Sequence, residues 1–155
     1  MNKVILILTL ILSTSLNAAE MIPFSKYVDE RPSWFKEGSE VAYAENRCGG
    51  LYSAIGLYFE ANGTTQEDKD TSQRMKKQGL KLMTRGGVLA TKYGMTAENS
   101  SKRTEALLKS YVDKLIENKR LNNSIFNDDI NADLKFCEEL TKVTNVIDKA
   151  TSAKK

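Results

Sequence analysis

Cys48 and Cys137 are the only cysteines in the chain, and their pairing is the most direct chemistry that the sequence predicts. In an exported protein an even number of cysteines indicates disulfide bonding, whereas in the cytosol the same pair would favour a metal or redox role. The chain has no C-x-x-C pair, which a catalytic disulfide would normally show. We therefore predict one structural disulfide worth about 4 to 5 kcal/mol, with two buried free thiols as the alternative.

Histidine is absent from the chain, and its absence narrows the chemistry that an active site could use. The most common general base, the nucleophiles that pair with histidine, and the usual zinc and haem ligands are all removed. Carboxylates such as Glu45 or Glu60 remain, but nothing in the sequence demands an enzyme. The acidic run at 128–133 lacks the glycine of a calcium-binding loop. We therefore expect no enzyme, and we predict no catalytic, cofactor-binding or metal-binding residues.

Five residues are candidates for binding. Arg47 lies between Tyr43 and Tyr52 on a predicted helix, and an arginine beside tyrosines could bind a carboxylate or a phosphate. A structural salt bridge is the more common role of such an arginine and is the favoured interpretation. Trp34 and Phe35 lie in an aromatic-rich segment, where they could present a strip to a partner or pack along the outside of the domain.

Residues 1–19 have the three parts of an export signal. Lys3 supplies the positive charge, an apolar run extends from Val4 to Leu16, and Ala18 or Ala19 provides the small residue before cleavage. The apolar run is shorter than the roughly 18 residues that a membrane span needs, and no later stretch approaches that length. We therefore expect a bacterial-type signal peptide, a periplasmic or secreted protein, and no integral membrane segment after cleavage.

The charge balance excludes two classes of partner. The chain has 23 Lys and Arg against 20 Asp and Glu, and removal of the signal would take Lys3 away. Nucleic-acid binding would need a strong basic stripe, and an anionic membrane surface would need a basic amphipathic face. We expect neither partner for a chain so close to neutral.

The mature chain divides into three predicted parts. Residues 20–37 contain both prolines, Pro23 and Pro32, which prevent a continuous helix and predict an irregular, aromatic-rich arm. Residues 38–150 form the predicted helical domain, and residues 151–155 a disordered basic tail. Apolar positions in the domain recur at alternating spacings of three and four, as in amphipathic helices. Cap and turn residues divide the domain into predicted helices over 39–62, 64–94, 96–122 and 127–150. The predicted caps are Ser39, Thr64 or Thr65, Thr96 and Asn127.

Four helices joined by short polar loops are typical of an antiparallel, up-down bundle. In that topology the first and fourth helices are antiparallel neighbours. Cys48 and Cys137 would then lie at similar levels, within about one helical turn. We therefore predict an all-α four-helix bundle with one disulfide between its first and fourth helices.

Glycines recur seven residues apart within the predicted helices, as at Gly49 and Gly56 and again at Gly79 and Gly86. Glycine in a helix interior is about 1 kcal/mol less favourable than alanine, so this repeat needs a reason. One reason is close approach of the first two helices along stripes without side chains. The glycines could instead break each helix in two, or they could open a crevice for a flat ligand. The sequence does not decide between these alternatives.

The leading functional prediction is a non-enzymatic protein-binding module of the cell envelope or periplasm, such as an inhibitor, an immunity protein or a chaperone-like protein. Its partner is expected to be another envelope protein. The alternative is a carrier that holds a small apolar or aromatic ligand in the bundle core. The fold class by itself does not choose between them.

Overall fold

The computed structural model describes residues 21–152. The predicted signal peptide at 1–19 lies outside the described residues. So do residues 153–155 of the predicted tail, whereas Thr151 and Ser152 continue the last helix. None of the described helices combines the length and the apolar character needed to cross a bilayer.

The described chain is all-α, as predicted, with no strand between residues 21 and 152. In chain order the elements are α1 (Phe24–Glu30), the short 3-10 helix η1 (Trp34–Lys36), α2 (Gly38–Asn62), α3 (Gln66–Lys92), α4 (Ala97–Asn122) and α5 (Asp128–Ser152). The four long helices begin and end within a few residues of their predicted bounds.

Side-chain caps start three of the long helices where the sequence predicts them. Asn127 Oδ1 accepts the N–H of Ile130 at the start of α5. Thr65 accepts the N–H of Asp68, and the Asp68 carboxylate accepts the N–H of Thr65, which is a capping box at the start of α3. Thr96 accepts the N–H of Asn99 at the start of α4. The predicted cap of the first long helix is wrong, because Ser39 lies inside α2 and Glu37 holds the cap position without a side-chain bond.

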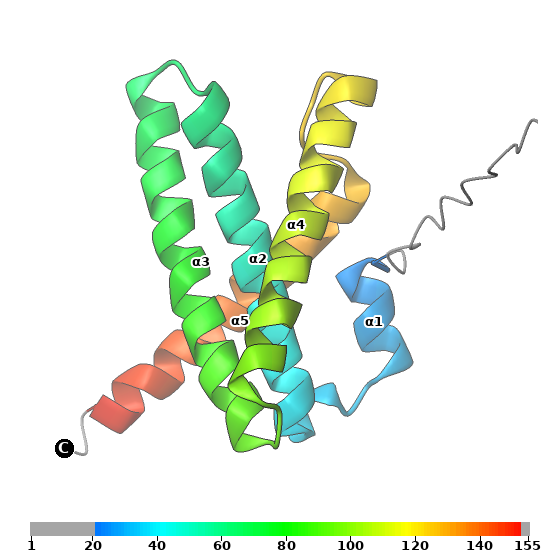
Figure 1. Ribbon diagram of the computed structural model, residues 1–155, viewed down its shortest axis with the longest axis vertical. Coiled ribbons are helices and arrows are strands. Elements are labelled where there is room, and N and C mark those ends of the chain that lie inside the picture. Colours follow the sequence, from blue (N-terminus) through cyan, green and yellow to red (C-terminus); the bar gives the residue numbers. More distant parts are fainter. Residues whose placement is uncertain (1–20, 153–155) are drawn as a thin grey trace, which may run out of the picture.

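The two central helices, α2 and α3, form a tight antiparallel hairpin (Figure 1). An ideal Cβ at Gly79 would lie 2.8 Å from the carbonyl oxygen of Gly49, and one at Gly86 would lie 2.9 Å from the carbonyl oxygen of Ala42. Both distances are shorter than real Cβ contacts, so the backbones meet where no side chain fits. We call this contact, made by Gly49, Gly56, Gly79 and Gly86, the glycine seam. Both helices run without a break, which rules out the helix-breaking interpretation.

The remaining long helices attach to this hairpin in different ways. α4 lies against α2, but its far end leans away from the hairpin, and α5 passes obliquely behind the other helices instead of running alongside α2 (Figure 1). The all-α class is therefore confirmed, whereas the up-down four-helix bundle is not. Comparing the levels of two cysteines predicts one point of contact between α2 and α5, but it says nothing about their crossing angle.

The predicted irregular arm is wrong in part. Residues 24–30 form the helix α1, with Pro23 at its N-cap, where a proline is well tolerated, and Pro32 just beyond its end. Phe24 and Tyr27 from this helix are buried in the core. The prolines thus border a helix instead of preventing one, and the arm is part of the domain.

Candidate functional site

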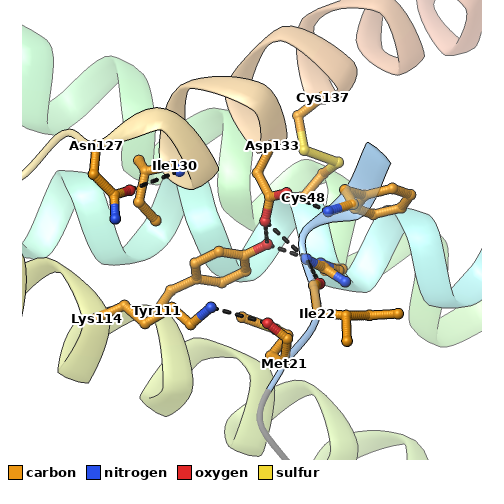
Figure 2. Close-up of polar contacts among 11 residues, drawn as sticks. Met21, Ile22, Cys48, Tyr111, Lys114, Asn127, Ile130, Asp133 and Cys137 are labelled. Carbon is orange, nitrogen blue, oxygen red and sulfur yellow. Dashed lines mark hydrogen bonds and ion pairs between the residues drawn. A yellow bond between two sulfur atoms is a disulfide. The ribbon is translucent and has the colours of Figure 1, made fainter. Parts of the chain in front are cut away.

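The predicted disulfide is present and joins α2 to α5. Cys48 and Cys137 are both fully buried, are 89 residues apart in sequence, and have Cα atoms 5.3 Å apart. The alternative of two free thiols is therefore wrong. The bond lies beside the most strongly polar group of side chains in the core (Figure 2).

Arg47, the residue before Cys48, lies at the centre of this group. Its Nη2 donates to the Asp133 carboxylate at 2.9 Å and to the carbonyl oxygen of Ile22 at 2.6 Å. Its Nε donates to the Tyr111 hydroxyl at 2.9 Å, and that hydroxyl donates in turn to Asp133 (Figure 2). One charged pair thus links α2, α4, α5 and the segment before α1.

The backbone at the start of the described chain is held by the same group. The N–H of Phe24 donates to the second oxygen of Asp133 at 2.6 Å, and the Lys114 ammonium donates to the carbonyl oxygen of Met21 at 2.9 Å. The Phe24 ring stacks on Phe136 with centroids 3.9 Å apart. We call the disulfide, the side chains of Arg47, Tyr111 and Asp133, and the backbone of residues 22–24 the buried clamp.

The buried clamp keeps its charges in a closed environment. Burial acts to lower the pKa of Arg47, but its interactions with Tyr111 and Asp133 outweigh burial and raise it, so the guanidinium stays charged. Burial raises the pKa of Tyr111 well above its ordinary value, which keeps the hydroxyl protonated as a donor to Asp133. Because Arg47 has no exposed surface, its charge is used to hold the fold together.

The structure separates the three residues that the sequence grouped around Arg47. Tyr43 packs against Tyr27 with ring centroids 4.9 Å apart, and Arg103 lies over its ring at 4.4 Å. Tyr52 is buried on the side of α5, where burial raises its pKa and Thr141 is its hydrogen-bond partner. Tyr43, Arg47 and Tyr52 therefore contact three different sets of neighbours and do not line one cleft.

The two aromatic residues predicted to face a partner also differ from each other. Trp34 packs on Phe136 with ring centroids 5.5 Å apart, whereas Phe35 is 60% exposed. Only Phe35 of this pair is left on the surface. Phe24 and Tyr27 of the arm are thus buried in the core and Trp34 is partly buried against it, so the aromatic side chains of the arm do not form one exposed strip.

Sequence reasoning missed Tyr111 and Asp133 as partners of Arg47. Asp133 belongs to a run of acids at the start of a helix, where such residues normally favour the helix dipole. One signal was present: Asp133 is four residues before Cys137 and therefore shares its helix face, while Arg47 directly precedes Cys48. A bond between the cysteines brings these two charges together.

Two surface depressions lie beside α4. The α2–α4 groove, of about 360 Å³, is lined mainly by apolar side chains that include Leu57, Val112, Leu115 and Ile116. The α3–α4 cavity, of about 550 Å³, is lined by a mixture of hydroxyl-bearing, small and apolar residues around Gly87. Within the described residues, no group of three or more Cys, Asp or Glu side chains is arranged to hold a metal ion.

Comparison of the chain with protein-family models, with curated proteins and with solved structures found no match.

Proposed function

We propose that this protein is a non-enzymatic binding protein of the cell envelope, and that its α2–α4 groove receives an amphipathic helix of a partner protein. The observation that carries the proposal is the apolar groove between α2 and α4. These two helices diverge toward one end (Figure 1). An amphipathic helix lying in an apolar groove is a recurring mode of protein recognition.

The apolar surface extends from the groove onto its edges. Leu57 on α2 is 40% exposed and Ile116 on α4 is 56% exposed, and both line the groove. Leaving two large apolar side chains in water beside an apolar depression is unfavourable until a partner covers them. Their positions on two facing helices suit an apolar stripe of a third helix better than a compact small molecule.

The rest of the molecule supports binding over catalysis. Two charged pairs reach into the described core. Arg47 and Asp133 of the buried clamp have no route to a substrate, and Glu45, which is 1% exposed, is held by Arg85 at 3.2 Å. Its disulfide is consistent with an oxidising compartment, which supports the proposal of export from the cytoplasm by the signal at 1–19.

A carrier of an apolar ligand could not hold that ligand between the glycine-lined helices. The crevice between glycine-lined helices is filled by the opposing backbone at Gly49 and Gly79, where an added Cβ would already be too close. An apolar ligand would have to use the α2–α4 groove instead. The experiment must therefore distinguish a partner helix from a small molecule at that one location.

Site-specific photo-crosslinking in the producing cell tests the proposal. A benzophenone side chain placed at Ile116 should yield a discrete adduct the size of a second protein. The matched control is Leu80 on α3, which is 63% exposed and does not line the groove. The adduct should be absent at Leu80 and should disappear when Leu57→Asp is added to the Ile116 probe.

Two results would contradict the proposal. Equal adducts at Ile116 and Leu80 would mean that the groove is not the contact surface. A probe at Ile116 that captures only small molecules, seen by mass spectrometry of the intact protein, would favour the carrier. Deleting residues 20–37 is not a clean test, since the deletion removes Phe24 from the core.

A further inference from the structure

Two adjacent glycines in the middle of α3 have opposite surroundings. A Cβ at Gly86 would lie 2.4 Å from Asn46 Oδ1, so the glycine seam requires glycine there. A Cβ at Gly87 would meet only the hydroxyl of Ser100, at an ordinary 3.7 Å. Packing would accept alanine at position 87, and alanine is the better helix former. Glycine at this position instead leaves open space over the floor of the α3–α4 cavity.

Ser100 faces this space from α4. The residue is only 4% exposed, and its hydroxyl makes no hydrogen bond to another group among residues 21–152, so its Oγ faces the solvent in the cavity. A hydroxyl in such a sheltered place can exchange a bound water for a polar group of a ligand. Ser100 therefore lines the cavity with an unused donor and acceptor, and this is independent of the glycine opposite.

The cavity has a sheltered floor and an exposed rim. Partly buried Met83, Gly87 and Leu108 lie on the floor with Ser100, and exposed Thr84, Ser101 and Glu105 lie on the rim. The floor thus offers an apolar surface with one free hydroxyl. The rim adds further hydroxyls and a carboxylate.

Glu105 is the one charged residue that lines the cavity. The neighbouring basic residues on α4 are turned to other partners: Lys102 pairs with Glu98 at 2.6 Å, and Lys109 pairs with Asp113 at 2.6 Å. Arg103 lies over the ring of Tyr43. Glu105 therefore gives the lining of the cavity one negative charge, which favours a cationic ligand.

We propose that the α3–α4 cavity binds a small organic amine that carries a second polar group. The ammonium pairs with Glu105 at the rim, the second polar group bonds to the hydroxyl of Ser100, and a short apolar body lies over Gly87 against Met83 and Leu108. This site is separate from the α2–α4 groove, so each can fail without the other.

A pair of compounds that share a cyclohexane ring and a hydroxyl but carry ionic groups of opposite charge tests the proposal. The oxidised, ¹⁵N-labelled protein is titrated by two-dimensional NMR with trans-4-aminocyclohexanol and with trans-4-hydroxycyclohexanecarboxylate. The amine should shift amide signals within residues 83–91 and 97–108, and it should bind about tenfold more tightly than the carboxylate. Equal binding of the two compounds, no binding of the amine, or shifts confined to other helices would overturn the proposal.

Variants assign the two halves of the site. Glu105→Gln should remove the preference for the amine, whereas Glu98→Gln, on the same helix but outside the cavity lining, should preserve it. Gly87→Val should fill the floor and weaken binding of both compounds, with circular dichroism confirming that α3 remains helical. An undiminished affinity in folded Gly87→Val protein would place the compounds elsewhere and refute the site.

Discussion

The glycine seam and the buried clamp hold α2 to its neighbours by opposite means. At the seam two backbones touch because side chains are missing, and Ser72 donates directly to the carbonyl oxygen of Gly56 at 2.8 Å. At the clamp a charged pair, a hydroxyl and a disulfide join four segments. The comparison shows that close packing and specific polar bonding occur in different regions of this fold. The seam supplies close packing over a long distance, and the clamp fixes α5 and α1 at one place.

The largest expected effect comes from removing the counter-charge of the clamp. Asp133→Ala leaves the Arg47 guanidinium buried without its carboxylate and should lower the free energy of unfolding by about 3 to 5 kcal/mol in urea titrations. Asp113→Ala removes a carboxylate from an exposed pair with Lys109 and should change stability by less than about 1 kcal/mol. Equal losses of unfolding free energy in the two variants would mean that the buried pair contributes no more to stability than an exposed pair.

Removing the disulfide should affect the clamp more than the seam. The double variant Cys48→Ala and Cys137→Ala should lose about 2 to 5 kcal/mol of stability, because the unfolded chain regains its freedom. In hydrogen exchange, amides of α1 and of the first half of α5 should lose protection first, since the clamp holds them, while amides along the seam stay protected. Simultaneous loss of protection in α3 and α5 would show that the two regions unfold as one unit.

The seam is tested by one added methyl group. Gly79→Ala places a Cβ 2.8 Å from the backbone of both Gly49 and Ser53 and should cost about 1 to 3 kcal/mol in thermal unfolding. Gly87→Ala, on the same helix but facing open space, should be neutral or stabilising by up to about 1 kcal/mol. The reverse order would show that the two helices do not meet along this face.

The smallest effect lies outside both regions, at the capping box that starts α3. The N–H and hydroxyl groups of Thr65 and the N–H of Thr64 hold the pKa of Asp68 below its ordinary value. Its contribution to stability is therefore fully present above the ordinary value of 3.8 and is lost as the pH falls through the lower folded value. The stability difference between the protein and Asp68→Asn should shrink on acidification. A difference that is independent of pH would contradict the cap.

Local signals in the sequence were enough to place the four long helices and to mark the glycines of the seam, although they did not decide what those glycines do. Thr65, Thr96 and the seven-residue glycine repeat act through neighbours in sequence or through one helix face, so a pattern reveals them. The sequence does not predict α1, because Pro23 and Pro32 argue against a helix that runs through both, whereas the seven-residue helix fits between them.

The clamp could not be predicted to the same depth. Arg47 and Asp133 are 86 residues apart, and Arg47 and Tyr111 are 64 apart, so their contact depends on how whole helices cross. Sequence periodicity showed Arg47 close to an inward face, but it could not show which polar groups would meet it there. The crossing angle of α5 could not be predicted for a similar reason. Two cysteines at the same height along their helices are compatible with many crossing angles.

The bond between Phe24 and Asp133 also affects the order in which the chain can fold. These residues are 109 positions apart, and a ribosome releases the chain from its N-terminus. Phe24 therefore lacks its carboxylate partner until the last helix has been synthesised, although Met21 and Ile22 can already bond to Lys114 and Arg47. During that interval Arg47 lacks its carboxylate, and folding can finish only when the end of the chain returns to its beginning.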